Sequence, residues 1–375
     1  MLMKKLHASK LTSLAALVAI ALGSTAYATQ YTVTPLGTLG GASTAVTGIN
    51  STGELTGYSI NSAGNDVAFL YSNGTMQNLG TLGGSSSVAE GINSAGQVVG
   101  YFNTSTGAQE AFLYGNGVMQ DLGSTLGGTS SVAYGINSTG QVVGYLDTTG
   151  KTEAFLYSSG ATQNLGSLGG TLSIAQGINS TGQVVGYSTN SAGSYGAFLY
   201  SNGTMQNLGG LGGTFSAAFA INSTGEVVGE SADSAGNRLA FLYSNGTMQN
   251  LGTVGGTTSR ANGINSAGQV VGYSANSAGN AAAFLYSNGV MQDLNSLIGS
   301  ASSEYTLTSA VGINKNGQIA VNGTITATGQ STGFLLTPVT STSSAGVPAP
   351  ATLGLLAAAM AGLLILRRKQ ARSFG

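Results

Sequence analysis

Short hydrophobic runs separated by polar turns dominate residues 31–336. Within residues 86–128, β-branched and aromatic runs end at Ile92, resume over 97–101 and 111–114, and return over 118–122. The segments between them are rich in Asn, Gly and Ser, and Gly and Asn tolerate the positive φ of tight hairpin turns. This pattern is typical of antiparallel hairpins, so it predicts four strands in this part of the chain.

The same four-stranded pattern recurs along the chain, and its Leu-Gly pairs are spaced 43 residues apart throughout. A Leu-Gly pair, changed to Leu-Asn in the last copy, begins at Leu36, Leu79, Leu122, Leu165, Leu208, Leu251 and Leu294. A Gly-Ile-Asn block and an Ala-Phe-Leu-Tyr block also recur seven times each, with small changes in single copies. A four-stranded unit of this length has the size of a propeller blade. We therefore predict an all-β fold, a seven-bladed β-propeller, over residues 29–336.

The two ends of the repeat region are offset from each other in a way that favours ring closure. Residues 31–37 align with the fourth strand of a unit, and residues 334–336 align with the third. Together the two fragments would complete one blade and cover a sheet edge that would otherwise be exposed. The alternative fold is a β-solenoid or open superhelical array, which would need capping units at its ends.

Composition removes several classes of active site. Charged residues make up 6% of the chain against roughly 25% in an average soluble protein. There is no Cys, and the single histidine is His7, so thiolate nucleophiles, zinc-thiolate sites and histidine triads are not expected in the body. Residues 29–336 contain four basic and twelve acidic residues, which argues against a nucleic-acid partner. We expect no cofactor and no metal site.

Residues 1–28 have the pattern of a secretory signal peptide. Lysines precede an apolar run over 11–22, and Ala26 and Ala28 supply small residues at a cleavage site. We expect cleavage after Ala28 and export of the body. The alternative is an uncleaved anchor, although the apolar run is shorter than the roughly 20 residues of a spanning helix.

The C-terminal residues have the pattern of a membrane-targeting segment. A Ser/Thr-rich linker over 337–346 leads into residues 347–375, and residues 351–366 carry no charge. The segment opens with Val347, Pro348, Ala349 and Pro350. A basic cluster follows the apolar stretch and consists of Arg367, Arg368 and Lys369. This order predicts a C-terminal transmembrane helix that holds the body outside the inner membrane while the basic anchor stays in the cytoplasm.

The C-terminal segment resembles the PEP-CTERM sorting signal, in which a Pro-Glu-Pro motif, a hydrophobic helix and an Arg-rich end occur in this order. The resemblance implies processing by an exosortase-type enzyme, in bacteria that usually make exopolysaccharide. Ala349 stands where the family has Glu. The alternative to a sorting signal is a plain tail anchor.

About 300 residues of the body resemble the HAF repeat of exported bacterial proteins, which is named for a His-Ala-Phe triplet. The resemblance rests on Gly-Ile-Asn-x-x-Gly-Gln-Val-Val-Gly-Tyr and on Ala-Phe-Leu-Tyr-x-x-Gly-x-Met-Gln. It implies export and a repeat fold, and it carries no established activity. The histidine is replaced in every copy, by Val67, Glu110, Glu153, Gly196, Leu239 and Ala282.

A catalytic site needs different residues in different roles, so it should appear as a departure from the repeat. The strongest departure lies in the fifth unit and in the segment that follows it. The departing residues are Glu226, Glu230, Asp233, Arg238 and Arg260. Two nearby carboxylates could serve as acid and base in glycoside cleavage. The simpler interpretation is a solvated, ion-paired blade edge. We also interpret two recurring tyrosine columns, which include Tyr187 and Tyr200, as blade packing, with carbohydrate stacking as the alternative.

The leading functional hypothesis is an exported, non-enzymatic repeat protein of the cell envelope or exopolysaccharide matrix. It would be anchored to the inner membrane or processed by an exosortase-type enzyme. Release of the body after processing would place it at the cell surface or in the matrix. Polysaccharide is the expected partner of the propeller. The competing hypothesis is a carbohydrate-active propeller enzyme that uses the acidic residues of the fifth repeat.

Overall fold

The computed structural model describes residues 30–339. The predicted signal peptide, including Ala26 and Ala28, lies outside these residues. So does the predicted sorting segment over 347–375, from Val347 to the basic cluster. Within the described part of the chain, no helix is both long and apolar enough to cross a membrane.

Antiparallel sheets of consecutive strands make up the fold. The first is β2 (Gly40–Ile49), β3 (Leu55–Asn61), β4 (Asp66–Ser72) and β5 (Thr75–Asn78). The next is β6 (Ser86–Ile92), β7 (Val98–Asn103), β8 (Gln109–Gly115) and β9 (Val118–Asp121). A further sheet is β18 (Gly212–Ile221), β19 (Val227–Asp233), β20 (Arg238–Ser244) and β21 (Thr247–Asn250). Another is β22 (Gly255–Ile264), β23 (Val270–Asn276), β24 (Ala281–Ser287) and β25 (Val290–Asp293).

One larger sheet joins two such groups of strands. Its first group is β10 (Ser130–Ile136), β11 (Val142–Thr148), β12 (Lys151–Ser158) and β13 (Ala161–Asn164). Its second group is β14 (Gly169–Ile178), β15 (Val184–Asn190), β16 (Tyr195–Ser201) and β17 (Thr204–Asn207). The two groups meet through a single parallel pair between Thr152 and Leu172. The strands within each group pair antiparallel with one another.

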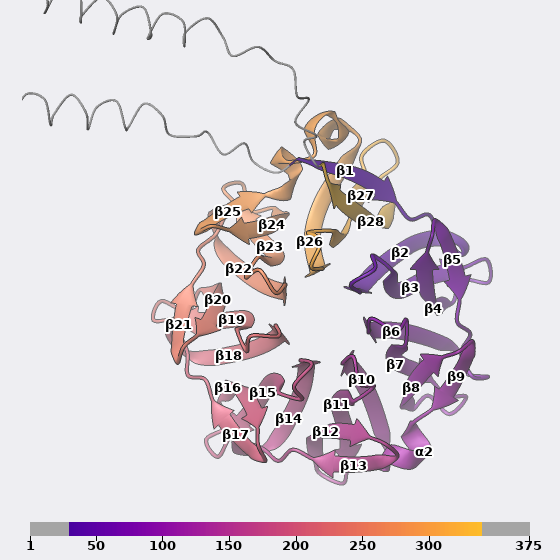
Figure 1. Cartoon of the computed structure of the whole chain (residues 1–375), viewed down its shortest axis with the longest axis vertical. Coiled ribbons are helices and arrows are strands. Elements are labelled where there is room, and N and C mark those ends of the chain that lie inside the picture. The colour runs from indigo at the N-terminus through magenta and orange to yellow at the C-terminus, as the bar shows by residue number, and fades with distance from the viewer. Residues whose placement is uncertain (1–29, 340–375) are drawn as a thin grey trace, which may run out of the picture. The chain divides into compact units, whose positions relative to one another are not determined.

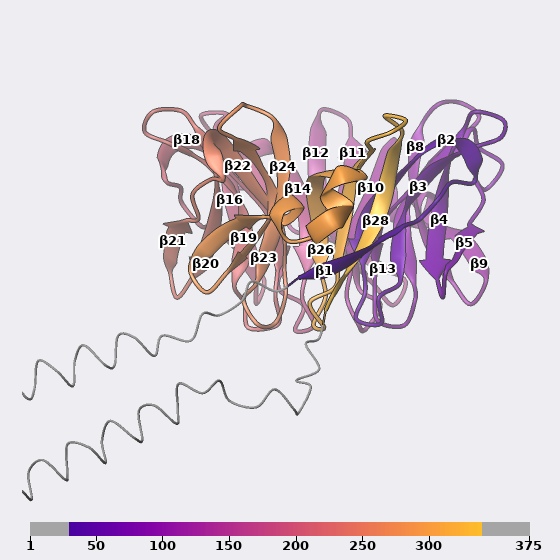
Figure 2. The ribbon, with the colours of Figure 1, turned by 90° about the horizontal axis from the view of Figure 1, so that it is seen from above.

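The sheets are arranged around a ring, and the first strand of each group lies innermost (Figure 1). These innermost strands are β2, β6, β10, β14, β18, β22 and β26 (Tyr305–Ile313). Seen from the edge, the strands run from one face of the ring to the other (Figure 2). The all-β, four-stranded repeat that the sequence predicts is therefore confirmed.

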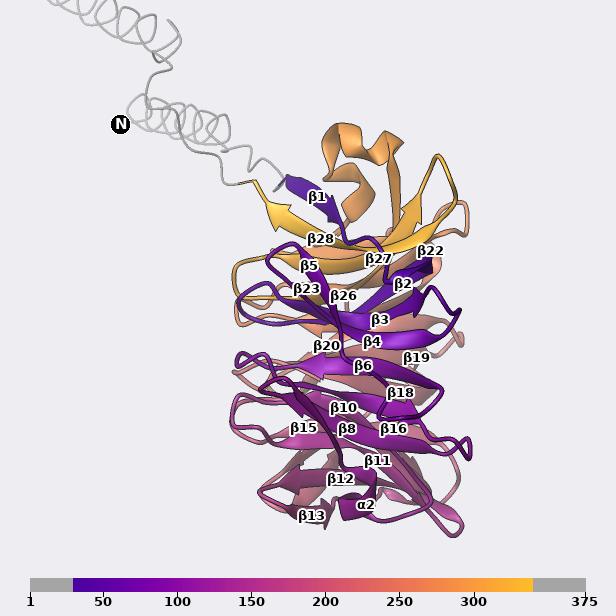
Figure 3. The same ribbon diagram turned by 90° about the vertical axis from the view of Figure 1, so that its right-hand side faces the viewer.

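The two ends of the described chain share one sheet. Its order is β1 (Tyr31–Pro35), β28 (Ser331–Pro338), β27 (Ile319–Ile325) and β26, so the most N-terminal strand lies beside the most C-terminal one (Figure 3). Tyr31 pairs with Pro338 and Pro35 pairs with Phe334. The predicted shared blade is confirmed. Because β28 continues to Pro338, its last two residues belong to the sheet rather than to the linker that we expected from residue 337.

Asn-Gly turns set the outer hairpins. Between β16 and β17, Asn202 has φ 51° and Gly203 has φ 80°. Two consecutive residues with positive φ form the type I′ turn, whose twist matches that of antiparallel strands. The same pair closes the outer hairpin in four other copies, beginning at Asn73, Asn116, Asn245 and Asn288.

A phenylalanine from the Ala-Phe-Leu-Tyr block fills the core of each unit. These rings are fully buried in all seven copies within residues 30–339: Phe69, Phe112, Phe155, Phe198, Phe241, Phe284 and Phe334. Beside Phe241 lies Gly229, where an added Cβ would overlap the carbonyl oxygen of Ala217. The repeated Val-Val-Gly therefore needs its glycine for close strand approach.

Buried serines connect most units to the next. The N–H of Ala197 in β16 donates to Ser216 Oγ in β18 at 2.9 Å, and that hydroxyl donates to the carbonyl of Gly209 at 2.6 Å. An equivalent bond joins Ala240 to Ser259, at 2.9 Å. These bonds satisfy backbone groups where neighbouring sheets meet, which unpaired would be costly to bury.

A closed relay of asparagines runs around one end of the innermost strands, and we call it the asparagine ring. Each member donates from Nδ2 to the backbone carbonyl of the next member at 3.0–3.1 Å, and Asn314 donates back to Asn50. Its members within the described residues are Asn50, Asn93, Asn137, Asn179, Asn222, Asn265 and Asn314. All are at most 5% exposed, so the relay ties the first unit to the last inside the protein.

Within residues 30–339, three short helices interrupt the strand pattern, and none of them was predicted. They are α2 (Gly123–Leu126), η1 (Leu294–Ser296) and η2 (Gly299–Ser303). Each lies where a connection between sheets departs from the Leu-Gly-x-Leu-Gly-Gly pattern of the other units.

Candidate functional site

The residue just before the Gly-Ile-Asn block differs in every unit. These residues are Thr47, Glu90, Tyr134, Gln176, Phe219, Asn262 and Val311. All seven line one cavity of about 400 Å³ at the centre of the ring. The residues three positions later form the invariant asparagine ring, so variation is concentrated at positions that face the central space.

A larger cavity of about 670 Å³ lies against β14, β18 and their neighbours, and we call it the aromatic cavity. Its aromatic lining consists of Tyr134, Tyr187, Tyr195, Phe215 and Phe219. Its charged lining consists of Glu90, Glu230, Arg238 and Arg260. Because it shares Glu90, Tyr134 and Phe219 with the 400 Å³ cavity, the two are parts of one central recess.

Three of the rings form a contact series along one wall. The ring centres of Tyr187 and Tyr195 are 6.0 Å apart, and those of Tyr195 and Phe215 are also 6.0 Å apart. Tyr195 is 39% exposed, so this wall is open to solvent. Phe215 stands at a position where other units carry serine, namely Ser43, Ser86 and Ser130.

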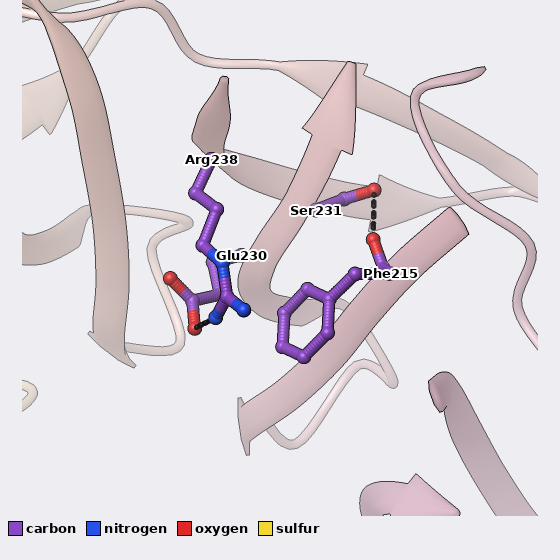
Figure 4. Close-up of polar contacts among 4 residues, drawn as sticks. All are labelled: Phe215, Glu230, Ser231 and Arg238. Atoms are coloured by element: carbon purple, nitrogen blue, oxygen red, sulfur yellow. Dashed lines mark hydrogen bonds and ion pairs between the residues drawn. The ribbon is translucent and has the colours of Figure 1, made fainter. Parts of the chain in front are cut away.

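Arg238 lines the cavity, and its guanidinium lies between the Glu230 carboxylate and the Phe215 ring (Figure 4). Its guanidinium lies 3.8 Å above the ring of Phe215 and donates from Nη1 to Glu230 Oε1 at 3.2 Å. The Glu230 side chain is 9% exposed and that of Arg238 is 52% exposed. A carboxylate buried to this degree needs a partner, and Arg238 supplies it.

Arg260 lies deeper and has no such partner. Its guanidinium stacks 3.7 Å above the ring of Phe219. Its Nε is buried without a hydrogen bond to any residue in the described part of the chain. No ion pair of Arg260 is found within residues 30–339 either.

Glu90 lines the same recess, and the pKa of its carboxyl is shifted. Burial raises the pKa of its carboxyl from 4.5 to about 7, so it is partly protonated at neutral pH. Burial also raises the pKa of the neighbouring Tyr134 hydroxyl. Among the described residues, no group of three His, Cys, Asp or Glu side chains is placed to hold a metal ion.

The structure separates the residues that the sequence grouped together in the fifth unit. Glu230 and Arg238 line the aromatic cavity, whereas Glu226 and Asp233 do not. Glu226 accepts hydrogen bonds from Asn222 Nδ2 at 2.7 Å and from Thr224, in a turn where most units carry Gln. Asp233 accepts from Asn237 and from backbone N–H groups of its own hairpin, and these bonds lower its pKa. Both residues therefore hold turns.

Glu90, Tyr134 and Phe219 were missed as site residues. The signal was present in the sequence, since each occupies a position that no two units fill alike. The two tyrosine columns also differ in where their side chains lie. Tyr200 is 7% exposed and packs in the core as predicted, whereas Tyr187 lines the aromatic cavity.

No protein-family model and no curated protein matches this chain. Among solved structures, it is similar to YCF48 bound to D1 peptide, with 13% identity, 85% of this chain and 98% of that chain covered, and a TM-score of 0.50. TolB from Acinetobacter baumannii matches with 13% identity, 72% and 76% coverage, and a TM-score of 0.41. With the ring of antiparallel sheets, the likeness to YCF48 defines the class of the protein as a β-propeller. At this identity the likeness concerns the fold alone.

Proposed function

We propose that this protein is an exported seven-bladed β-propeller that binds polysaccharide at the aromatic cavity, as a structural or binding module of the cell envelope or exopolysaccharide matrix. Seven blades result if the strands β10–β17 form two blades that touch at one parallel pair. The seven-membered asparagine ring supports the same count.

A single observation carries the proposal: side chains that differ between otherwise near-identical units converge on one recess. Residues needed only for folding would repeat, as the buried phenylalanines do. The divergent residues instead include aromatic rings, Gln176 and two arginines. Flat rings provide large apolar contact area at low entropic cost, and Tyr and Gln offer donors and acceptors for sugar hydroxyls.

A glycan array tests the binding proposal. We expect the full chain to retain at least one polysaccharide, and the double variant Phe215→Ser, Phe219→Thr to lose most of that retention. Both replacements already occur at the same positions in other units, at Ser43 and Thr47, so the fold should tolerate them. Thr258→Ser is the matched control, because Thr258 corresponds to Phe215 in the next unit and does not line the aromatic cavity. Retention of no glycan, or equal retention by the double variant, would refute the proposal.

Export and anchoring are a separate part of the proposal. They are supported by the signal-peptide pattern over 1–28 and the sorting pattern over 347–375. Cell fractionation of the full chain, with and without residues 347–375, tests them. We expect the full chain in the membrane or outside the cell, with the truncated chain no longer membrane-bound. A body that stays in the cytoplasm would contradict export.

The competing function is carbohydrate cleavage, and one observation favours it. Glu90 and Glu230 line the same cavity, and a glutamic acid with a raised pKa can act as general acid near neutral pH. The pair would then be Glu90 and Glu230, in place of Glu226 and Glu230. Release of reducing ends that is lost in both Glu90→Gln and Glu230→Gln, and kept in Glu226→Gln, would establish this enzyme. Bound glycans that stay intact would support the binding module.

A further inference from the structure

Positive charge in the body is concentrated at one place. Residues 29–336 contain four basic residues: Lys151, Arg238, Arg260 and Lys315. Both arginines line the aromatic cavity, whereas both lysines are exposed and line none of its wall. A body with eight more acidic than basic residues thus presents half of its cations to one recess.

The two arginines differ in how their charge is compensated. Arg238 is paired with Glu230 at 3.2 Å. The guanidinium of Arg260 has no ion pair within residues 30–339, and its buried Nε has no hydrogen bond there. At the position of Arg260, the other units carry Ala45, Val88, Val132, Ile174, Ala217 and Ser309. The blade architecture therefore does not require a cation there, and the uncompensated charge is specific to the sixth unit.

The geometry of Arg260 prepares it for a planar anion. Stacking at 3.7 Å on Phe219 fixes the plane of the guanidinium. Its Nε is buried without an acceptor, and no ion pair of its guanidinium is found within residues 30–339, so its positive charge is left for a ligand to compensate. A guanidinium presents its N–H groups as a rigid fork that matches the two oxygens of a carboxylate.

We propose that Arg260 binds the carboxylate of an acidic sugar, so that the polysaccharide recognised by the aromatic cavity contains uronic acid residues. This inference rests on the proposed glycan-binding function and names its ligand class. The carboxylate would accept from the two Nη groups of Arg260, while the neighbouring rings of Tyr187 and Phe219 pack against the sugar. Glu230 does not oppose this binding, because Arg238 already compensates it.

Matched esters isolate the role of the charge. Binding of the full chain to oligogalacturonate and to oligomannuronate is measured by titration calorimetry and compared with the methyl esters of the same oligosaccharides. Since a hydrogen bond to a charged group is worth about 1.5–3 kcal/mol, we expect at least one acid to bind about 10-fold to 100-fold more tightly than its ester. Arg260→Gln should bring the acid to the level of the ester, and Arg260→Lys should restore part of the difference. Lys151→Gln, which removes one positive charge outside the cavity, should keep the full difference.

The possible outcomes separate this inference from the proposed function. Glycans that bind equally as acid and ester would overturn the role of Arg260 and leave glycan binding intact. A preference for acids that survives in Arg260→Gln would likewise overturn it, as would a preference for sulfated over carboxylated sugars. Binding to a peptide with a free carboxylate, with no glycan bound, would overturn both proposals. Thermal unfolding of each variant identifies any that fail to fold, and Arg260→Val, which installs the residue found at Val88, then replaces Arg260→Gln.

Discussion

The asparagine ring and the aromatic cavity are built on the same innermost strands, yet they follow opposite rules. Asn222 is one of seven identical residues in a closed relay, whereas Phe219, three residues before it, has no identical counterpart in any other unit. The relay satisfies every buried amide it contains and links the first unit to the last. A closed, repeated scaffold of this kind leaves neighbouring positions free to diverge, and those positions face the central recess.

The strongest way to test this contrast is to truncate one phenylalanine of each kind within the fifth unit. Phe241 is fully buried in the repeated core, so Phe241→Ala should lower the free energy of unfolding by about 3–5 kcal/mol. Urea denaturation measures the loss. The half-buried Phe215 provides the comparison, and an equal loss in Phe215→Ser would erase the distinction between core and cavity.

Breaking the asparagine ring should have the next largest effect. In Asn222→Ala, the N–H groups of Thr224 and Glu226 lose their acceptor, and the carbonyl of Asn265 loses its donor. Buried groups left unpaired cost about 1–3 kcal/mol each, and we expect a total loss of about 2–4 kcal/mol. The exposed Asn280 makes no side-chain hydrogen bond within residues 30–339, so Asn280→Ala is the control and should stay within about 0.5 kcal/mol of the parent protein.

The buried carboxyl of Glu90 should make the free energy of unfolding depend on pH. The folded-state pKa of Glu90 is about 7 against 4.5 in the unfolded chain, so the folded state binds the proton more tightly between these values. The free energy of unfolding should therefore fall as pH rises from about 4.5 to 7, by about 1–3 kcal/mol, and level off above pH 7. Denaturant titrations across this range should show that Glu90→Gln removes most of the slope and that Glu304→Gln, at an exposed position, keeps it. A slope unchanged in Glu90→Gln would contradict the buried state of this carboxyl.

The smallest effect on stability is expected at the cavity wall. Phe215→Ser places in the fifth unit the residue found at Ser43, and it should change the free energy of unfolding by less than about 1 kcal/mol. Glycan retention should nevertheless fall. Thermal melting beside the array measurement checks both expectations, and a stable variant with unchanged retention would remove Phe215 from the binding site.

Repetition explains why the repeated four-stranded antiparallel sheets could be predicted from the sequence. The 43-residue period predicts the repeated sheets, and the Asn-Gly pairs predict their outer turns. The offset between Tyr31 and Leu336 predicts that the two ends of the repeat region share a sheet. The helix at Gly123–Leu126 was missed because it occupies a connection that departs from the repeat.

The candidate site was predicted only in part. Glu230 and Arg238 stood out as charged departures from the repeat and do meet, at 3.2 Å. Glu226 also stood out, but it occupies a turn position where Gln makes equivalent hydrogen bonds, so its charge marks no cavity. Glu90 and Arg260 belong to different units, far apart in sequence, and only closure of the ring brings them to the same recess.

The most direct measurement is polysaccharide retention by a triple variant, Phe215→Ser, Phe219→Thr, Arg260→Val, in which each new residue already occupies the same position in another unit. If repeated positions maintain the ring and divergent ones bind the ligand, the variant melts within a few degrees of the parent protein and retains no polysaccharide. A variant that folds and still retains polysaccharide at the parent level would contradict the assignment of the aromatic cavity as the binding site.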